Sequence, residues 1–241
     1  MKRDEVFKEK YAKPSDFKFT SKVAGVFDDM VNRSVPFYEE IQRMTAELAA
    51  NHAIENTHIY DLGCSTGTTL ILMDKSVSTQ VKFVGVDDSA AMLDKCRIKL
   101  NEAHFSHPFD LQVADLNTHV TITDASVVVL CLTLQFVRPI NRERLIKEIF
   151  NGLQKEGVVI LIEKILAEDS SFNRDFINYY YAMKRRHHYS DMEIAQKREA
   201  LENVLIPYKL SENITMLRDA GFQQFEVFFK WYNFAGIIAK K

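Results

Sequence analysis

The sequence predicts an α/β fold with a doubly wound parallel sheet, and three observations support this prediction. Short apolar segments alternate with helical patterns from residue 58 to residue 162, as in a parallel sheet covered by helices on both faces. The segment 125–132 is apolar at nearly every position, which is typical of a central strand. Two apolar segments at 225–231 and 234–239 have a very short link, which predicts an antiparallel pair at one edge. Together these segments predict a Rossmann-like, seven-stranded sheet.

The expected elements follow in order along the chain. Periodic apolar residues predict two N-terminal helices separated by Pro36, and Gly221 is expected to end the last helix. The expected helices are 22–33, 37–51, 68–73, 89–103, 141–153 and 211–220, and the first five strands are 58–62, 81–86, 111–114, 125–132 and 158–162.

Residues 171–205 interrupt this alternation. They show two successive helical patterns rich in Tyr, Arg and Glu, with no strand between them. An insertion after a strand of such a sheet often shapes the substrate pocket. We therefore expect one domain over residues 1–241, with N-terminal helices at 22–51 and a helical insertion at about 171–205.

Composition narrows the class of protein. The 241 residues are 46% hydrophobic and carry a net charge of −2, so no excess of basic residues favours direct binding of a long nucleic acid. A small-molecule substrate fits better. The cysteines at 64, 96 and 131 are odd in number and widely spaced, which predicts neither a disulfide framework nor a metal site. With no signal-like start and no apolar segment long enough to cross a bilayer, we expect a cytoplasmic protein without a membrane partner.

The clearest local motif is Tyr60-Asp-Leu-Gly-Cys-Ser-Thr-Gly, where the first strand turns into a helix. Gly63 and Gly67 allow a tight turn and a close approach of a ligand to the backbone. Ligands of open parallel sheets bind at this carboxyl edge. On its own the motif fits a plain glycine turn equally well.

Two acidic residues support the prediction of a nucleoside site at the carboxyl edge of the sheet. Asp87 ends the second strand, about 20 residues beyond the glycine turn, where a carboxylate commonly accepts hydrogen bonds from ribose hydroxyls. Asp115 ends the third strand, where its side chain and the N–H of Leu116 can read an adenine edge. Each acid alone fits a helix cap or a turn. Signals at three consecutive strand ends favour a nucleoside.

The type of nucleoside follows from the glycine spacing. A dinucleotide fingerprint requires glycines where this chain has Ser65 and Thr68, so the dehydrogenase reading fails. The spacing Asp61-x-Gly63-x-Ser65-x-Gly67 instead resembles the first motif of class I S-adenosylmethionine-dependent methyltransferases. The motif of nucleobase amino-methyltransferases is missing after the fourth strand. Cys131 lies in an apolar strand and reads as a buried structural thiol rather than a nucleophile.

Four segments carry a more specific resemblance. They are Arg33-Ser-Val-Pro-Phe-Tyr38, Tyr60-Asp-Leu-Gly-Cys-Ser65, Leu132-Thr-Leu-Gln-Phe136 and Gln196-Lys-Arg-Glu-Ala-Leu-Glu-Asn-Val204. They resemble the carboxy-S-adenosyl-L-methionine synthase family. The resemblance runs from about Phe17 to the tail and includes the helical insertion, which general methyltransferases do not share.

The resemblance implies that the chain converts S-adenosyl-L-methionine and prephenate into carboxy-S-adenosyl-L-methionine and phenylpyruvate. Aromatisation of prephenate releases carbon dioxide, and the departing hydroxide deprotonates the sulfonium methyl group, which then captures the carbon dioxide. Because the substrate supplies the base, no catalytic side chain is assigned. The family also implies a homodimer and a separate tRNA-modifying enzyme that uses the product at the wobble uridine.

The family's binding positions carry over to matching residues. Arg198 corresponds to the arginine that holds the added carboxylate, supplied by the neighbouring subunit. Cys131 stands where the family pattern has Asn. The positions implied to contact the cofactor are Tyr38, Gly63, Cys64, Ser65, Asp87, Asp88, Asp115, Leu116 and Cys131.

Two other functions stay open at this point. An ordinary methyltransferase acting on a small acid would use the same cofactor but would not need Arg198 beside the sulfonium. A non-catalytic cofactor-binding module would bind the cofactor without turnover. The basic run of Arg185, Arg186, His187 and His188 is left unassigned, and Glu163 and Lys164, at the end of the fifth strand, are expected to face the pocket.

Overall fold

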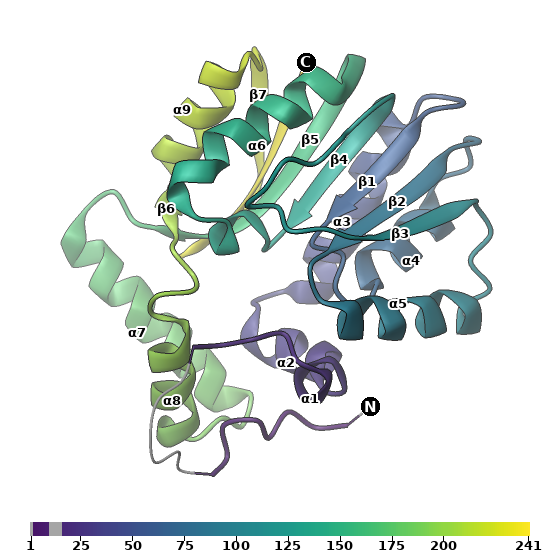
Figure 1. The fold of residues 1–241 in the computed structure, drawn as a ribbon. Helices are drawn as coiled ribbons and strands as arrows, with labels where there is room; N and C mark the ends of the chain where they lie inside the picture. The colour runs from purple at the N-terminus through teal and green to yellow at the C-terminus, as the bar shows by residue number, and fades with distance from the viewer. Residues whose placement is uncertain (1, 10–15) are drawn as a thin grey trace.

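The computed structural model describes residues 2–9 and 16–241 and shows a mixed sheet in the order β3-β2-β1-β4-β5-β8-β7 (Figure 1). The strands β1 to β5 are parallel, and β8 runs antiparallel to both β5 and β7, as the two C-terminal apolar segments predicted. The strands are β1 (His58–Leu62), β2 (Lys82–Asp87), β3 (Phe109–Val113), β4 (Ala125–Cys131), β5 (Leu153–Leu166), β7 (Gln224–Trp231) and β8 (Phe234–Lys240), with a two-residue β6 (Tyr208–Lys209) beside β5.

The helices follow the predicted alternation, with one difference. The expected helix over 22–33 is divided, because Val26 leaves helical dihedral angles (φ −127°, ψ 6°) between α1 and α2. The helices are α1 (Ser21–Ala24), α2 (Phe27–Ser34), α3 (Tyr38–His52), α4 (Thr68–Ser76), α5 (Ala90–Glu102), α6 (Pro139–Gly152), α7 (Ser170–Arg186), α8 (Asp191–Leu201) and α9 (Leu210–Ala220), with a short 3₁₀ turn η1 (Leu134–Phe136).

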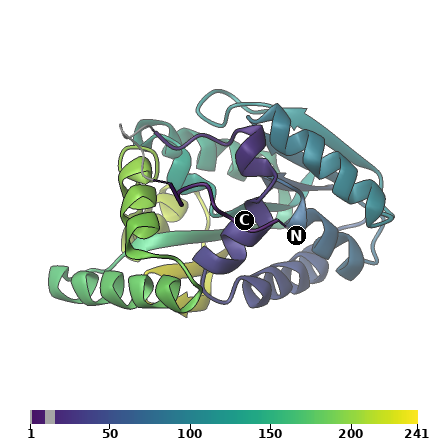
Figure 2. The same ribbon diagram turned by 90° about the horizontal axis from the view of Figure 1, so that it is seen from below.

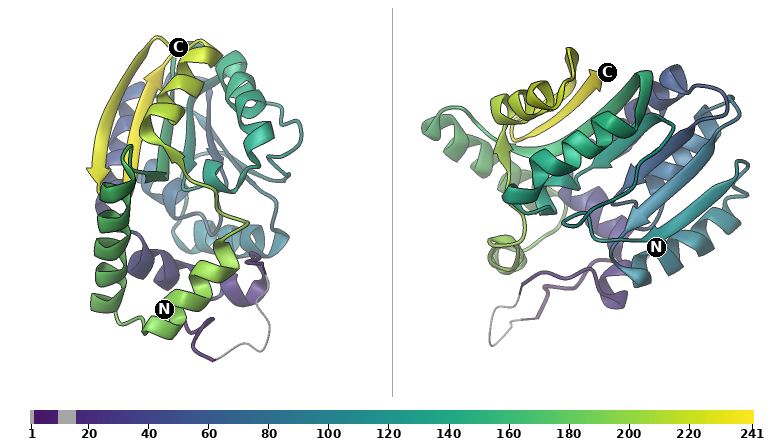
Figure 3. Two further views of the ribbon diagram at one scale, coloured as in Figure 1. Left: turned by 90° about the vertical axis from the view of Figure 1, so that its left-hand side faces the viewer. Right: turned by 45° about the horizontal axis from the view of Figure 1, so that its top comes forward.

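The predicted insertion is the pair α7 and α8, and it lies at the carboxyl edge of the sheet. Figure 1 shows α1, α2 and α8 on the side toward which the arrow of β4 points. Seen from that side in Figure 2, the N-terminal helices lie between the insertion and α5. Figure 3 shows α7 and α8 extending beyond the strands. Two segments far apart in the sequence therefore cover the strand ends together.

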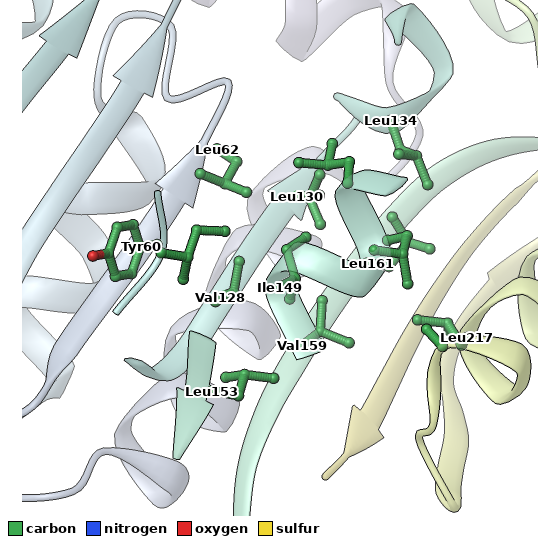
Figure 4. Close-up of a cluster of buried hydrophobic side chains, with 14 of the residues drawn as sticks. Tyr60, Leu62, Val128, Leu130, Leu134, Ile149, Leu153, Val159, Leu161 and Leu217 are labelled. Carbon is green, nitrogen blue, oxygen red and sulfur yellow. The ribbon is translucent and has the colours of Figure 1, made fainter. Parts of the chain in front are cut away.

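Helices cover both faces of the sheet, and successive side chains of a strand are buried alternately under one helix layer and the other. On β4, Val128 and Leu130 face the layer of α6 and α9, which supplies Ile149 and Leu217 (Figure 4). Val127 and Val129 face the opposite layer, formed by α3, α4 and α5. A strand that is apolar on both sides needs this double cover. Within the described residues, no helix has both the length and the apolar character needed to cross a membrane.

Arg33 connects the N-terminal helices to the insertion. From α2, its guanidinium donates to the carbonyl oxygens of His187 (2.8 Å) and His188 (3.0 Å), in the turn between α7 and α8. It also pairs with Asp29 at 3.2 Å and lies 4.0 Å from the ring centre of Tyr189. One planar side chain thus links α2 to the turn of the insertion.

Candidate functional site

A cavity of about 360 Å³ opens at the carboxyl ends of the parallel strands, beneath the N-terminal helices and the insertion. Its volume is in the range of small-molecule sites. The wall contains every residue that the sequence assigned to cofactor or carboxylate binding: Tyr38, Gly63, Cys64, Ser65, Asp87, Asp88, Asp115, Leu116, Cys131 and Arg198.

The glycine turn brings backbone to the cavity wall. Gly63 has a positive φ of 80°, and a Cβ atom there would lie 2.4 Å from Oγ1 of Thr133. The N–H groups of Gly63 and Cys64 both donate to the carbonyl oxygen of Val86, at 2.7 and 3.0 Å. The turn is therefore held against β2 with no room for a side chain, which leaves the backbone open to a ligand.

Asp87 joins this turn to the next helix. One carboxylate oxygen accepts the N–H of Ser65 (3.0 Å) and the other accepts the N–H of Ser89 (2.9 Å). Burial raises the pKa of Asp87 to about 6, against these two hydrogen bonds, which lower it. The carboxylate is oriented toward the cavity and has acceptor capacity left for a diol.

Asp61 is the buried carboxyl behind the turn, and sequence reasoning used it only as a motif position. It is 1% exposed, and neither of its oxygens has a hydrogen-bond partner in the described part of the chain. Burial and then the nearby charge of Asp87 raise its pKa to about 8. A buried carboxyl without a partner is costly in its charged form, so Asp61 is held as the neutral acid behind the turn, outside the described cavity wall.

Asp115 combines the two roles that the sequence left open. Its Oδ1 accepts from the backbone N–H of Asn117 (2.8 Å) and from the Asn117 side chain (2.9 Å), which is a turn role. The side chain is nevertheless exposed on the cavity wall, next to the buried Leu116. Asp88 is also exposed on the wall, and its pKa is raised by partial burial and then by the charge of Asp115.

Cys131 ends β4 as a neutral thiol. Burial, the largest cause, raises the pKa of this thiol above its ordinary value, and the carboxyls of Asp61 and Glu163 add to the effect. Its sulfur accepts from Nε2 of Gln42 at 3.4 Å. Burial also raises the pKa of the neighbouring Tyr38 phenol. Both groups are therefore uncharged on the cavity wall.

Arg198 is exposed on α8 and lines the cavity of its own chain. Its predicted reach into a neighbouring subunit stays a prediction. The basic run that precedes α8 is absent from the described cavity wall. Arg185 pairs with Asp191 at 2.7 Å, and the carbonyl groups of His187 and His188 bind Arg33.

Lys164 and Glu163, near the end of β5, lie on opposite faces of the strand. Lys164 lines the cavity, as expected. The expectation is wrong for Glu163, because successive side chains of a strand point to opposite faces. Glu163 is 4% exposed and accepts the N–H of Leu134 at 3.0 Å, away from the wall.

Sequence reasoning missed two further lysines on the wall, Lys184 and Lys197. Each directly precedes an arginine that the sequence did single out, Arg185 and Arg198. The available signal was helical spacing, since the exposed arginine and the inward lysine occupy different faces of the same helix.

Comparison with known proteins places this site in context. A family model described as a methyltransferase domain matches residues 59–157. A carboxy-S-adenosyl-L-methionine synthase of Methylococcus capsulatus is 54% identical over 242 residues, which cover 100% of both proteins. The protein of that name from Desulfotalea psychrophila is 42% identical over 100% of this chain and 98% of its own.

Solved structures match the same fold. A putative S-adenosyl-L-methionine-dependent methyltransferase from Methanococcus maripaludis has a TM-score of 0.61 at 18% identity, over 96% of this chain and 97% of its own. A putative O-methyltransferase from Nostoc punctiforme has a TM-score of 0.65 at 18% identity, over 92% of this chain and 59% of its own. The predicted class I methyltransferase fold is thereby confirmed.

Proposed function

The chain belongs to the carboxy-S-adenosyl-L-methionine synthase family, and from this premise we propose that it makes carboxy-S-adenosyl-L-methionine from S-adenosyl-L-methionine and prephenate, releasing phenylpyruvate. Carboxyl transfer to the sulfonium methyl group, rather than methyl transfer, is the finer part of this proposal.

One observation carries it: Arg198 lies on the wall of the same cavity as the nucleoside-binding acids Asp87 and Asp115. A guanidinium near a sulfonium is repelled unless an anion lies between them. Methyl transfer adds no anion to the cofactor beyond the carboxylate of its methionine part. A carboxylated product supplies one, and a guanidinium can bind it through two parallel hydrogen bonds.

The chain's residues hold and orient both substrates in this scheme. When bound, S-adenosyl-L-methionine supplies a sulfonium whose methyl protons are acidic. Asp87 and Asp115 bind the nucleoside, and Arg198 binds the carboxylate that forms. The covering helices limit water, which would otherwise compete for carbon dioxide.

The atoms balance without a protein base. Aromatisation of prephenate breaks one C–C bond and one C–O bond and releases carbon dioxide and hydroxide. The hydroxide takes a proton from the methyl group and becomes water, and a new C–C bond joins the methyl carbon to carbon dioxide. The scheme therefore assigns no role to Glu163, whose buried carboxyl is not part of the described cavity wall.

We place the product upstream of a separate enzyme that carboxymethylates the wobble uridine of tRNA, and we propose that the chain acts as a cytoplasmic homodimer. The net charge of −2 supports the proposal that this protein binds only small molecules and that the separate enzyme binds the tRNA.

Mass spectrometry of the small molecule released from purified, denatured protein tests the product, and incubation with both substrates tests turnover. We expect carboxylated S-adenosyl-L-methionine and phenylpyruvate in equal amounts. Methylation of a small acid, with no carboxylated product from prephenate, would return the chain to the ordinary methyltransferases. Tight cofactor binding without any turnover would support a binding module.

A further inference from the structure

Three lysines gather at the end of the cavity formed by β5 and the insertion. Lys164 (β5) and Lys184 (α7) share the ring of Tyr180, with Nζ atoms 4.9 and 5.6 Å from its centre. Lys184 and Lys197 (α8) share the ring of Tyr189, at 5.2 and 5.6 Å. All three lysines line the cavity. They form one continuous group, which we call the lysine cluster.

The lysine cluster lacks matching negative charge. Lys197 donates to Oγ of Ser34 (3.1 Å) and lies 3.9 Å from a carboxylate oxygen of Asp4. The ammonium groups of Lys164 and Lys184 form no hydrogen bond or ion pair with any residue that the structure describes, although Lys184 is only 4% exposed. A buried, unpaired ammonium is expensive, so its retention inside a cavity points to an anionic ligand.

The electrostatics of the cluster agree with this geometry. Burial, followed by the charges of Lys197 and Lys164, lowers the pKa of Lys184 to about 6 against the opposing effect of Asp4 and Glu193. Burial also lowers the pKa of Lys164 to about 8. A carboxylate at hydrogen-bond distance would raise the pKa of each lysine again and favour its charged ammonium form.

The cluster lies at the opposite end of the cavity from the nucleoside acids. Asp87 is the last residue of β2 and Asp115 follows β3, whereas Lys164 belongs to β5. In the order β3-β2-β1-β4-β5, β2 and β5 are three strand spacings apart, or roughly 14 Å. A nucleoside held by the acids therefore leaves the lysine end free for a second molecule.

We propose that Lys164 and Lys184 form the binding subsite for a compact cyclic dicarboxylate, the acid that reacts with the sulfonium compound. Two lysines close to one aromatic ring, with no partner for either ammonium group in the described residues, match two carboxylates on one small ring. The single carboxylate of a methionine moiety would leave one ammonium uncompensated. This inference rests on the proposed function and names the side chains that select its second substrate.

Binding measured without turnover tests the subsite separately from the reaction. Calorimetry with protein saturated by S-adenosylhomocysteine, which has no methyl group to react, gives the Kd of prephenate directly. We expect Lys164→Met and Lys184→Met each to weaken prephenate at least tenfold and to change S-adenosyl-L-methionine affinity less than twofold. Lys184→Met should also melt at the same temperature as the parent or higher, because Met removes a buried amine that has no hydrogen-bond partner in the described residues. Lys184→Arg should retain part of the affinity.

Arg186→Gln is the matched control, since it removes one positive charge from α7 at an exposed position outside the cavity wall. It should leave both affinities unchanged. Unaltered prephenate binding in both lysine variants would overturn the subsite, and so would an equal loss of prephenate and S-adenosyl-L-methionine. If Lys184→Met is too unstable to measure, Lys164→Met decides alone.

The two proposals fail in different ways. If the parent binds prephenate through the lysines but forms no carboxylated product, the subsite stands and the proposed reaction falls. If the parent binds another cyclic dicarboxylate such as phthalate in a lysine-dependent way and ignores prephenate, the subsite stands and the named substrate is wrong. If the parent binds neither acid, the subsite is wrong.

Discussion

At the scale of single residues, Asp87 holds the glycine turn and faces the cavity at the same time. Its two oxygens accept from Ser65 and Ser89, so an amide in its place would oppose one of those N–H groups with its own NH₂. We expect Asp87→Asn to weaken S-adenosyl-L-methionine roughly 10- to 100-fold, the effect of losing one or two hydrogen bonds to a charged group. Equilibrium dialysis measures this, with the exposed Asp94→Asn on α5 as the control.

The raised pKa of Asp87 adds a pH dependence to this prediction. With a pKa of about 6, the carboxylate is the main form above that value and the acid below it. Affinity for S-adenosyl-L-methionine should therefore fall as pH drops below 6, by up to tenfold per unit. Equal affinity at pH 5 and pH 7.5 would contradict the assignment of the diol to an ionised Asp87.

Asp61 gives a stability prediction. Its folded pKa of about 8 lies above the ordinary Asp value of 3.8, so folding takes up a proton between these values and stability falls as pH rises. Asn carries no such penalty. We expect ligand-free Asp61→Asn to melt above the parent, with the difference growing from pH 5 to pH 8 and reaching roughly 2–8 °C. A difference that is constant or negative over this range in calorimetric scans would refute it.

These residues differ in how far sequence could predict them. The glycine turn and the acids Asp87 and Asp115 were predicted because a site at strand ends has fixed positions in the sequence. Lys184 and Lys197 could not be assigned in the same way. Helical spacing separates each lysine from the neighbouring exposed arginine, but whether the lysine's face lines the cavity depends on where the insertion lies over the sheet.

At the scale of elements, the insertion is held by a few specific contacts. Arg33 of α2 binds two carbonyl groups in the turn between α7 and α8 and lies against the ring of Tyr189. We expect Arg33→Lys to lower stability by about 1–3 kcal/mol, since lysine has neither the planar group nor enough donors in the right geometry. Hydrogen exchange should rise in residues 184–191 and stay unchanged in β1 and β4.

Arg43→Lys on α3 is a suitable control, because Arg43 is exposed and pairs with Glu40 on its own helix at 2.6 Å. It should leave exchange unchanged throughout. Equal exchange of the turn in the Arg33 variant and the parent would show that other contacts hold the insertion.

The strands and helices themselves were largely predictable, because they have an apolar period and several of them end or begin at a Gly or Pro, such as Pro139 and Gly221. The first and last residues of these elements were harder to predict. β5 begins at Leu153 rather than at residue 158, because the buried Leu153 pairs with Ala125 of β4, whereas the next three residues, 154–156, are polar and exposed. The apolar spacing also did not predict the break between α1 and α2 at Gly25 and Val26, because helical spacing of apolar residues continues across it.

At the scale of the whole molecule, the strand order separates two kinds of charge along one edge. Acids follow β2 and β3, and lysines and Arg198 come from β5 and the insertion. The alternation of strands and helices predicted this edge, whereas the placement of the insertion over it required the structure. The resulting cavity can take a nucleoside at one end and an anion at the other.

The last prediction concerns which subunit of the expected homodimer supplies Arg198 to a given site. The family resemblance implies a homodimer in which Arg198 reaches the neighbouring site, and its exposed place on α8 leaves it free to do so. Mixing Arg198→Ala with Asp87→Asn tests this, since each variant alone should make little carboxylated product. If the arginine crosses, mixed dimers contain one site with both residues intact, and random exchange restores about a quarter of the parent activity.

Unmixed Arg198→Ala measures the role of the side chain itself. It should bind S-adenosyl-L-methionine normally and hold carboxy-S-adenosyl-L-methionine at least tenfold more weakly, because only the latter presents the added carboxylate. Equal losses for both ligands would remove this role. If mixing restores nothing although subunits exchange, Arg198 serves the cavity of its own chain, whose wall it already lines. The dimer would then be dispensable for binding the product's carboxylate.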